Sequence, residues 1–114
     1  MNTKIPGKQG ETIAFCYLQE NNYKILSTNF TCKIGEIDII AQKQDVIIFI
    51  EVKARATKKF GLPREAVTLN KQKKIKMVAT YYLQKTKNFD KACRFDVIEI
   101  LNGKINHIEN AFMW

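Results

Sequence analysis

Several features that mark common protein classes are missing from this chain of 114 residues. No apolar run is long enough to cross a membrane, and residues 1–7 lack the apolar core of a signal peptide. His107 is the only histidine, which excludes histidine-based triads and multi-histidine metal centres. Internal repeats and a glycine-rich phosphate loop are absent, since Gly61 and Gly103 stand alone.

Cysteine is also scarce. The three cysteines, Cys16, Cys32 and Cys93, are odd in number and widely spaced, which argues against a disulfide framework and against a zinc site. We interpret them as reduced thiols that pack in the interior of a cytoplasmic protein without membrane contact.

The composition is that of an ordinary globular chain, with 46% hydrophobic and 26% charged residues. The length predicts one domain over residues 1–114, with residues 1–8 as a flexible lead-in. Negative charge is in deficit, because 19 lysines and arginines face 11 acids and leave a net charge of +8. A basic surface favours a polyanionic partner, usually nucleic acid, although charge alone does not separate DNA from RNA, the ribosome or anionic lipid.

The most informative stretch is residues 35–53. Two runs rich in isoleucine, valine and phenylalanine flank a polar break at residues 42–45, which predicts two strands joined by a tight hairpin. The second run is apolar at both parities and is therefore expected to be central in its sheet, buried on both faces.

Three charged residues interrupt these runs. If the turn is centred between residues 43 and 44, Asp38 lies opposite Phe49 and diagonal to Glu51, so Asp38, Glu51 and Lys53 share one face. Two close carboxylates suit Mg²⁺ or Mn²⁺, and a lysine beside them can serve an attacking water and a phosphate. The alternative is a structural ion pair of Lys53 with Glu51 or Asp38, and a one-residue slip of register would move Asp38 to the other face.

The remaining elements follow from periodicity and turn signals. We expect a helix over residues 10–21, an outer strand over 23–30, and a helix from residue 65 or 68 to residue 86 with a break near 69–70. Strands over 94–100 and 104–108 are joined by Asn102 and Gly103, a type I′ turn signal. The order is thus α-β-β-β-α-β-β, and the first three strands form an antiparallel meander.

Two further acids have alternative interpretations. Glu11, in the first turn of the first helix, is either an acid favoured by the helix dipole or a third acid aimed at Asp38 and Glu51. Asp96 lies in a strand, where it either joins the site or bonds to Arg94 or a backbone group.

Basic residues gather in two places. Arg55, Lys58, Lys59 and Arg64 follow the strand of Glu51 directly, and we expect them to line the approach to the site and to bind nucleic acid. Lysines also crowd the start of the second helix, where they do not complement the helix dipole and are better explained by a ligand. Those lysines are Lys71, Lys73, Lys74 and Lys76, and we choose Lys71 and Lys74 as contacts to the phosphate backbone.

A set of short motifs runs nearly from end to end of the chain. The motifs are GEID at 35–38, FIEVKAR at 49–55, GKQGE at 7–11, NF at 29–30, FG at 60–61, KQ at 71–72, RFDV at 94–97 and NAF at 110–112. In this combination the sequence resembles the YraN-like family of small proteins. That family in turn resembles restriction-endonuclease-like nucleases, and among them the archaeal-type Holliday junction resolvases. The family usually has a basic residue two places after Asn29, whereas this chain has Thr31, which leaves one implied phosphate contact open.

The resemblance implies an α/β fold with a restriction-endonuclease-like core, in which helices flank a mixed central sheet. It also implies a metal-dependent DNA endonuclease, with branched or damaged DNA as candidate substrates and a homodimer as a candidate assembly. Asp38 and Glu51 would hold Mg²⁺ or Mn²⁺, Lys53 and Glu11 would complete the catalytic set, and Lys71 and Gln72 would lie beside the site. The rival hypothesis is a nucleic-acid-binding accessory protein that keeps the fold and does not cut.

Overall fold

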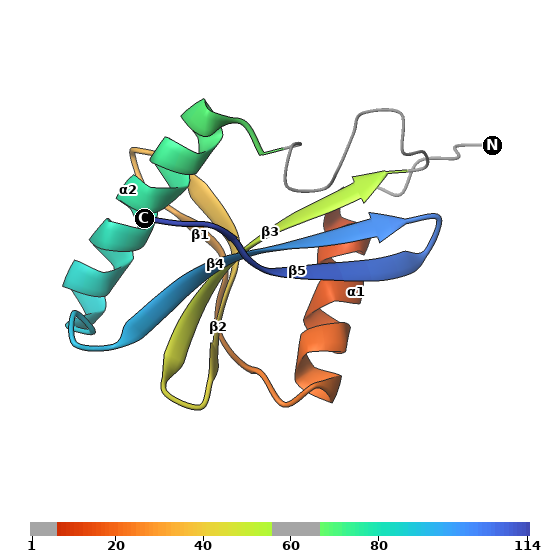
Figure 1. Cartoon of the computed structure of the whole chain (residues 1–114), viewed down its shortest axis with the longest axis horizontal. Coiled ribbons are helices and arrows are strands. Elements are labelled where there is room, and N and C mark those ends of the chain that lie inside the picture. Colours follow the sequence, from red (N-terminus) through yellow and green to blue (C-terminus); the bar gives the residue numbers. More distant parts are fainter. Residues whose placement is uncertain (1–6, 56–66) are drawn as a thin grey trace.

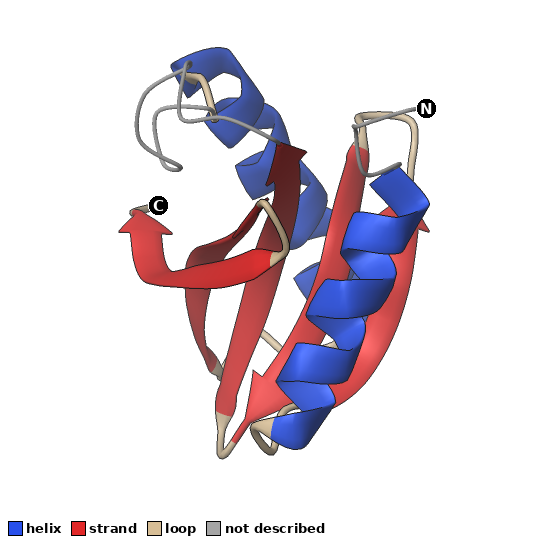
Figure 2. Ribbon diagram, turned by 90° about the vertical axis from the view of Figure 1, so that its right-hand side faces the viewer, coloured by secondary structure: helices blue, strands red, loops and turns tan. Residues whose placement is uncertain are grey.

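The computed structural model describes residues 7–55 and 67–114, which form a five-stranded sheet with one helix on each face (Figures 1 and 2). The elements are α1 (Gly7–Glu20), β1 (Lys24–Thr31), β2 (Glu36–Lys43), β3 (Val46–Arg55), α2 (Leu69–Thr86), β4 (Ala92–Leu101) and β5 (Lys104–Phe112). The α/β class and the order α-β-β-β-α-β-β expected from the sequence are confirmed.

The sheet has the spatial order β1-β2-β3-β4-β5. The first three strands form an antiparallel meander, β4 pairs parallel to β3, and β5 returns antiparallel to β4. The sheet is therefore mixed, as the restriction-endonuclease-like core requires, and β1 is an edge strand as predicted.

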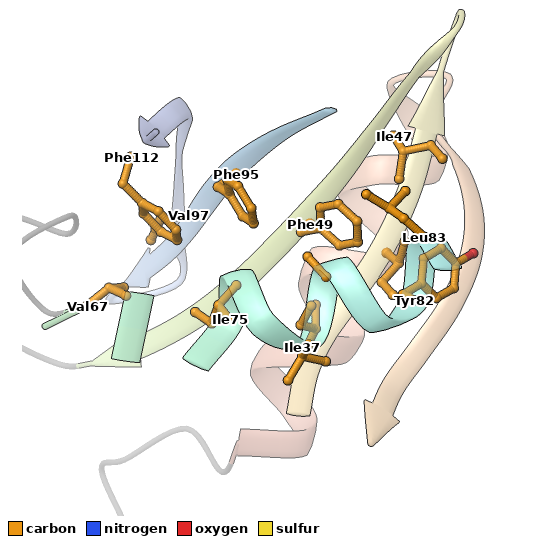
Figure 3. Packing of buried hydrophobic residues seen from close by; sticks show 13 residues of the cluster. Ile37, Ile47, Phe49, Val67, Ile75, Tyr82, Leu83, Phe95, Val97 and Phe112 are labelled. Atoms are coloured by element: carbon orange, nitrogen blue, oxygen red, sulfur yellow. The ribbon is translucent and has the colours of Figure 1, made fainter. Parts of the chain in front are cut away.

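Strand β3 lies at the centre because its side chains are apolar in both directions. Ile48 and Ile50 pack in the cluster under α1, whereas Ile47 and Phe49 pack in the cluster under α2. All four side chains are at most 1% exposed. Figure 3 shows the α2 side of this core, where Phe49 lies between Phe95 and the helix. The prediction of a central, doubly buried strand is thus confirmed.

Local signals set the ends of both helices. Helix α1 begins at Gly7, three residues before the predicted start, so residues 7 and 8, which were expected in the flexible lead-in, belong to the helix. Helix α2 begins at Leu69 behind the N-cap Thr68, whose side chain accepts a hydrogen bond from the backbone amide of Lys71 at 3.2 Å. The break expected near residues 69–70 is therefore the start of the helix, and the alternative start at residue 65 lies outside the described residues.

The last two strands are longer than predicted, but their turn is the one expected. Asn102 and Gly103 both have positive φ angles, 50° and 79°, the signature of a type I′ turn. The three cysteines are free thiols; Cys32 and Cys93 pack against the core, whereas Cys16 is exposed, which corrects the prediction of a packing role for it. Neither described helix is long and apolar enough to cross a membrane.

Gly10 lets α1 approach the sheet closely. A Cβ atom on Gly10 would lie 2.9 Å from Cβ of Ala54 on β3, a distance at which one of the two elements must shift. Neither atom can rotate away, because each is attached directly to the backbone. The glycine therefore fixes how near the N-terminal part of α1, with Glu11 next to the glycine, comes to the end of β3.

We predict that Gly10→Ala destabilises the protein. Overpacking costs about 1–3 kcal/mol, more than the roughly 1 kcal/mol that alanine gains over glycine inside a helix. Gly35→Ala is the matched control, because its Cβ would meet Val78 at an ordinary 3.6 Å. Chemical denaturation should also show that Gly10→Ala with Ala54→Gly loses less stability than the sum of the single changes. Additive losses would mean that the contact between α1 and β3 does not limit the approach.

Candidate functional site

The site is built where β2 and β3 separate. Their ladder runs from Lys43 opposite Val46 to Ile39 opposite Ile50, so the turn consists of Gln44 and Asp45. The turn expected between residues 43 and 44 is therefore wrong by one position. Each β2 residue therefore lies opposite a β3 residue two positions further along the chain than predicted. The shift by two keeps every side chain on the predicted face, but it places Asp38 across from Glu51 instead of Phe49.

Asp38 is held by the backbone of the neighbouring strand. Its Oδ2 accepts a hydrogen bond from the amide of Val52 at 2.8 Å, just beyond the last ladder pair of β2 and β3. A side-chain oxygen thus accepts the hydrogen bond from this amide that a backbone carbonyl of β2 would accept if the ladder continued. This bond orients the carboxyl group toward the end of β3 that carries Glu51.

Glu51 is the more buried of the two acids, with 6% of the residue exposed. Its parity along β3 is that of Phe49, so its side chain points to the α2 side. There Nζ of Lys71 lies 3.0 Å from Oε2 of Glu51. Among the described groups that oxygen has no hydrogen bond of good angle, although the ammonium is within ion-pair distance.

Lys53 was the partner expected for a purely structural ion pair. Within residues 9–55 and 67–114 the ion pair of Glu51 is formed with Lys71 of α2, and none is formed by Lys53. Lys53 instead lines an open cleft of about 310 Å³. Glu51 therefore forms an ion pair, but with Lys71 and not with Lys53, the partner that the structural alternative expected.

The cleft brings together residues from four elements. Its lining is Glu11 of α1, Asp38 of β2, Glu51, Val52, Lys53 and Ala54 of β3, and Lys71 of α2. Figure 1 shows that both helices begin toward the end of the sheet at which β3 finishes. Glu11 lines the cleft, but it follows the first turn of α1, which begins at Gly7, so its predicted position within the first turn is wrong. The described residues contain no group of three or more His, Cys, Asp or Glu side chains able to hold a metal. The role of Glu11 as a third acid stays a prediction.

The two acids repel each other. Burial, a hydrogen bond with Glu51 and the charge of Glu51 raise the pKa of Asp38 to about 7, against the lowering effects of the Val52 amide and Lys71. Burial lowers the pKa of Lys71, but the charge and hydrogen bond of Glu51 outweigh it, so the pKa of this lysine lies above its usual value. The pair of acids is under-neutralised by the protein itself and favours a proton or an added cation.

The structure describes four of the expected nucleic-acid contacts, namely Arg55, Lys71, Gln72 and Lys74. Lys74 is exposed on α2, whereas the side chain of Arg55 is largely buried and pairs with Glu99. Nε2 of Gln72 donates to the carbonyl of Val67 at 2.9 Å, so this side chain secures the start of α2. The other three expected contacts, Lys58, Lys59 and Arg64, lie outside the described residues.

Asp96 belongs to a separate network on the α1 side of the sheet. Its carboxylate accepts from Arg94 Nε at 3.0 Å and from the Asn110 amide at 2.9 Å, and lies 2.7 Å from Nε2 of His107. Tyr17 extends the network to α1, with its hydroxyl 2.9 Å from Nδ1 of His107. The expected bond to Arg94 is confirmed, and the network ties β4 and β5 to the helix.

Two features of the site were not identified from the sequence. The pairing of Lys71 with Glu51 depends on where α2 docks, and no spacing pattern signals it. The buried Glu99 lies in register with Lys53 on the parallel strand β4. The position of Glu99 inside an apolar strand could have indicated a buried ion pair, because a buried acid needs a partner. That partner is Arg55.

The fold and the site define a small α/β protein of restriction-endonuclease-like architecture with an acid pair at the end of its central strand. The family model described as "Uncharacterised protein family UPF0102" matches residues 10–100, and the chain belongs to that family, the YraN-like family. A UPF0102 protein of Clostridioides difficile is 52% identical over 114 residues, covering 98% of this chain and 100% of the relative. Similar proteins of Caldicellulosiruptor saccharolyticus (46% over 118 residues, covering 98% and 100%) and Thermodesulfovibrio yellowstonii (50% over 106 residues, covering 93% and 94%) match nearly end to end.

We predict that Asp38→Asn stabilises the metal-free protein at high pH. The folded protein keeps a proton on Asp38 that the unfolded chain releases above its ordinary pKa of 3.8, so this group's contribution is complete below that pH and is lost as the pH rises through about 7. Since one pKa unit corresponds to about 1.4 kcal/mol, the gain near pH 8 should be on the order of a few kcal/mol and should vanish near pH 4.

The measurement is urea unfolding of both proteins in chelator across this pH range. Asparagine keeps an oxygen that can accept the Val52 amide, so the comparison isolates the charge. Parallel stability curves for the two proteins would show that folding does not raise the pKa of Asp38.

Proposed function

We propose that this protein is a divalent-cation-dependent endonuclease that hydrolyses phosphodiester bonds of DNA. The observation that carries the proposal is the cleft itself, where two under-neutralised carboxylates and a lysine without a described ion pair face the same opening. A purely structural set would pair these charges with one another. The net charge of +8 supports a polyanionic substrate.

The residues present fit a divalent cation. Asp38 and Glu51 offer hard carboxylate oxygens, and Oε2 of Glu51 is a buried acceptor without a well-aligned hydrogen bond among the described groups. Two protein carboxylates suit Mg²⁺ or Mn²⁺, which retain water and take further ligands from substrate phosphate. When bound, such an ion polarises a phosphoryl oxygen and makes water a nucleophile near neutral pH.

The chain's own side chains have separate tasks in this proposal. Asp38 and Glu51 hold the cation, with Asp38 kept in place by the Val52 amide. Lys53 stands two residues beyond Glu51 on the same face of β3, where its ammonium stabilises negative charge that develops on the phosphate. Glu11, at the wall formed by α1, orients water at the cleft.

The DNA contacts extend the same surface. Lys71 lines the cleft, and Lys74 follows it on α2. The three free thiols fit a cytoplasmic setting for the reaction. Branched or damaged DNA as the substrate, and a homodimer that would pair two sites, follow from the resemblance to junction resolvases alone.

We predict that Lys53→Ala lowers cleavage about a hundredfold or more while the protein stays folded, because one contact to developing charge is lost. Its stability loss should be small, about 1 kcal/mol or less, since the lysine has no ion pair among the described residues. The assay uses linear, nicked and four-way DNA with Mg²⁺, Mn²⁺ or chelator, and Lys24→Ala, at the start of β1, as the control. If wild type binds these DNAs but cuts none of them with either metal, the accessory-protein alternative is correct.

We also predict that Lys74→Ala flattens the salt dependence of DNA binding by about one unit of logarithmic slope, the effect of one lost phosphate contact. Lys85→Ala, in the last turn of the same helix, removes the same charge far from the cleft and should leave the slope nearly unchanged. Fluorescence anisotropy at several salt concentrations measures both. Equal changes in the two variants would place the DNA away from the start of α2.

A further inference from the structure

Lys71 is the one cation that the described structure places on the acid pair, and it is unevenly held. The Glu51 side chain is 7% exposed and fixed in a central strand, whereas the Lys71 side chain is 46% exposed on the first turn of α2. The ammonium therefore meets a rigid partner from a flexible, half-solvated stem. Such a stem can leave its partner without any movement of the backbone.

Helix stability does not explain a lysine at this position. The first turn of α2 contains no acid, and a positive charge there opposes the helix dipole. Thr68 already caps the helix, and Gln72 secures it to Val67. What Lys71 gains is the contact with Glu51, so its charge acts on the acid pair and not on the helix.

The position of the ammonium decides what it can do. It lies 3.0 Å from Oε2 of Glu51, the oxygen that has no well-aligned hydrogen bond among the described groups. The same ammonium lines the cleft beside Asp38 and Lys53. A divalent cation that binds this oxygen competes with Lys71, because both are attracted to the same negative charge of Glu51. The two cannot both bind Glu51 at full strength.

We propose that Lys71 is an exchangeable stand-in for the divalent cation, displaced from Glu51 when the ion binds and then free to bind a backbone phosphate. The inference rests on the proposed function and adds its regulation. A phosphate that takes up Lys71 removes the competitor, so DNA tightens metal binding, and by reciprocity the metal tightens DNA binding. In metal-free protein without DNA, Lys71 neutralises part of the negative charge of the acid pair.

This role differs from that of Lys53. Lys53 projects from the rigid strand β3 on the same face as Glu51 and stays in the cleft in either state. Lys71 comes from a helix on the other wall and is defined by its ability to leave. Loss of Lys53 should therefore weaken catalysis, whereas loss of Lys71 should change the affinity for metal.

The first experiment measures Mn²⁺ binding by calorimetry without DNA at about pH 8, above the pKa of Asp38. Lys71→Met keeps the aliphatic stem and removes the charge. Lys73→Met, on the exposed face of the same helix, removes the same charge and is the matched control. We expect Lys71→Met to bind Mn²⁺ about tenfold more tightly than both wild type and Lys73→Met, a difference of about 1.4 kcal/mol.

The second experiment tests the coupling with a phosphorothioate duplex that resists cleavage. DNA should tighten Mn²⁺ binding to wild type and to Lys73→Met, and this effect should be much smaller in Lys71→Met. Thermal unfolding adds an independent readout, since Lys71→Met should lose stability in chelator and regain it with Mn²⁺.

The outcomes separate the two proposals. If wild type binds Mn²⁺ but Lys71→Met binds no more tightly than Lys73→Met, Lys71 is not a competitor and only the exchange is overturned. Absence of Mn²⁺ binding by all three proteins, with and without DNA, would overturn the exchange and the metal-dependent function together.

Discussion

Strand β3 is covered by a helix on each face, and burying an unpaired charge there would cost free energy. Its charged side chains therefore lie beyond the segment that the two helices cover. Ile47 to Ile50 are sealed under the two helices, and the charged residues follow only after this segment. At that point β2 leaves the ladder, and the Asp38 carboxylate takes the Val52 amide. Where β2 and β3 separate, the Val52 amide keeps a hydrogen-bond partner and the carboxylates of Asp38 and Glu51 find room at the edge of the core. The cleft is a consequence of how the core ends.

The chain has many positive charges, but its negative charge at the cleft is concentrated in a small volume. A polyanion that approaches Asp38 and Glu51 meets repulsion unless a cation stands between them. The described structure offers two sources of positive charge at that place, Lys53 on the strand and Lys71 on the helix. The basic first turn of α2 is unfavourable for the helix alone, and the acid pair accounts for it. The unfavourable interaction of Lys71 with the helix dipole of α2 is thus offset by its attraction to Glu51 on β3.

The sequence was sufficient for the features that depend on neighbouring residues. The parity of apolar positions located β3 at the centre, and Asn102 with Gly103 specified the hairpin turn. Asp38, Glu51 and Lys53 came to one cleft even though the predicted turn was misplaced, because a shift of two partners preserves the face of each side chain. The contact of Lys71 with Glu51 could not be predicted, since it depends on the docking of a helix against a strand distant in sequence. The same holds for Asp96, whose choice between two roles was settled by the pairing of β4 with β5.

The parallel pairing of β3 with β4 has a consequence for how the chain acquires its structure. The first three strands meet through short connections, whereas β4 reaches β3 only after the crossover that contains α2. Contacts between distant segments form slowly, so we expect the meander with Asp38 and Glu51 to assemble before α2 delivers Lys71. During synthesis the N-terminal part emerges first and lacks both the second helix and its lysine. The acid pair would then exist for a time in a half-built sheet with one face exposed, and the last elements to arrive both close the core and bring Lys71 to Glu51.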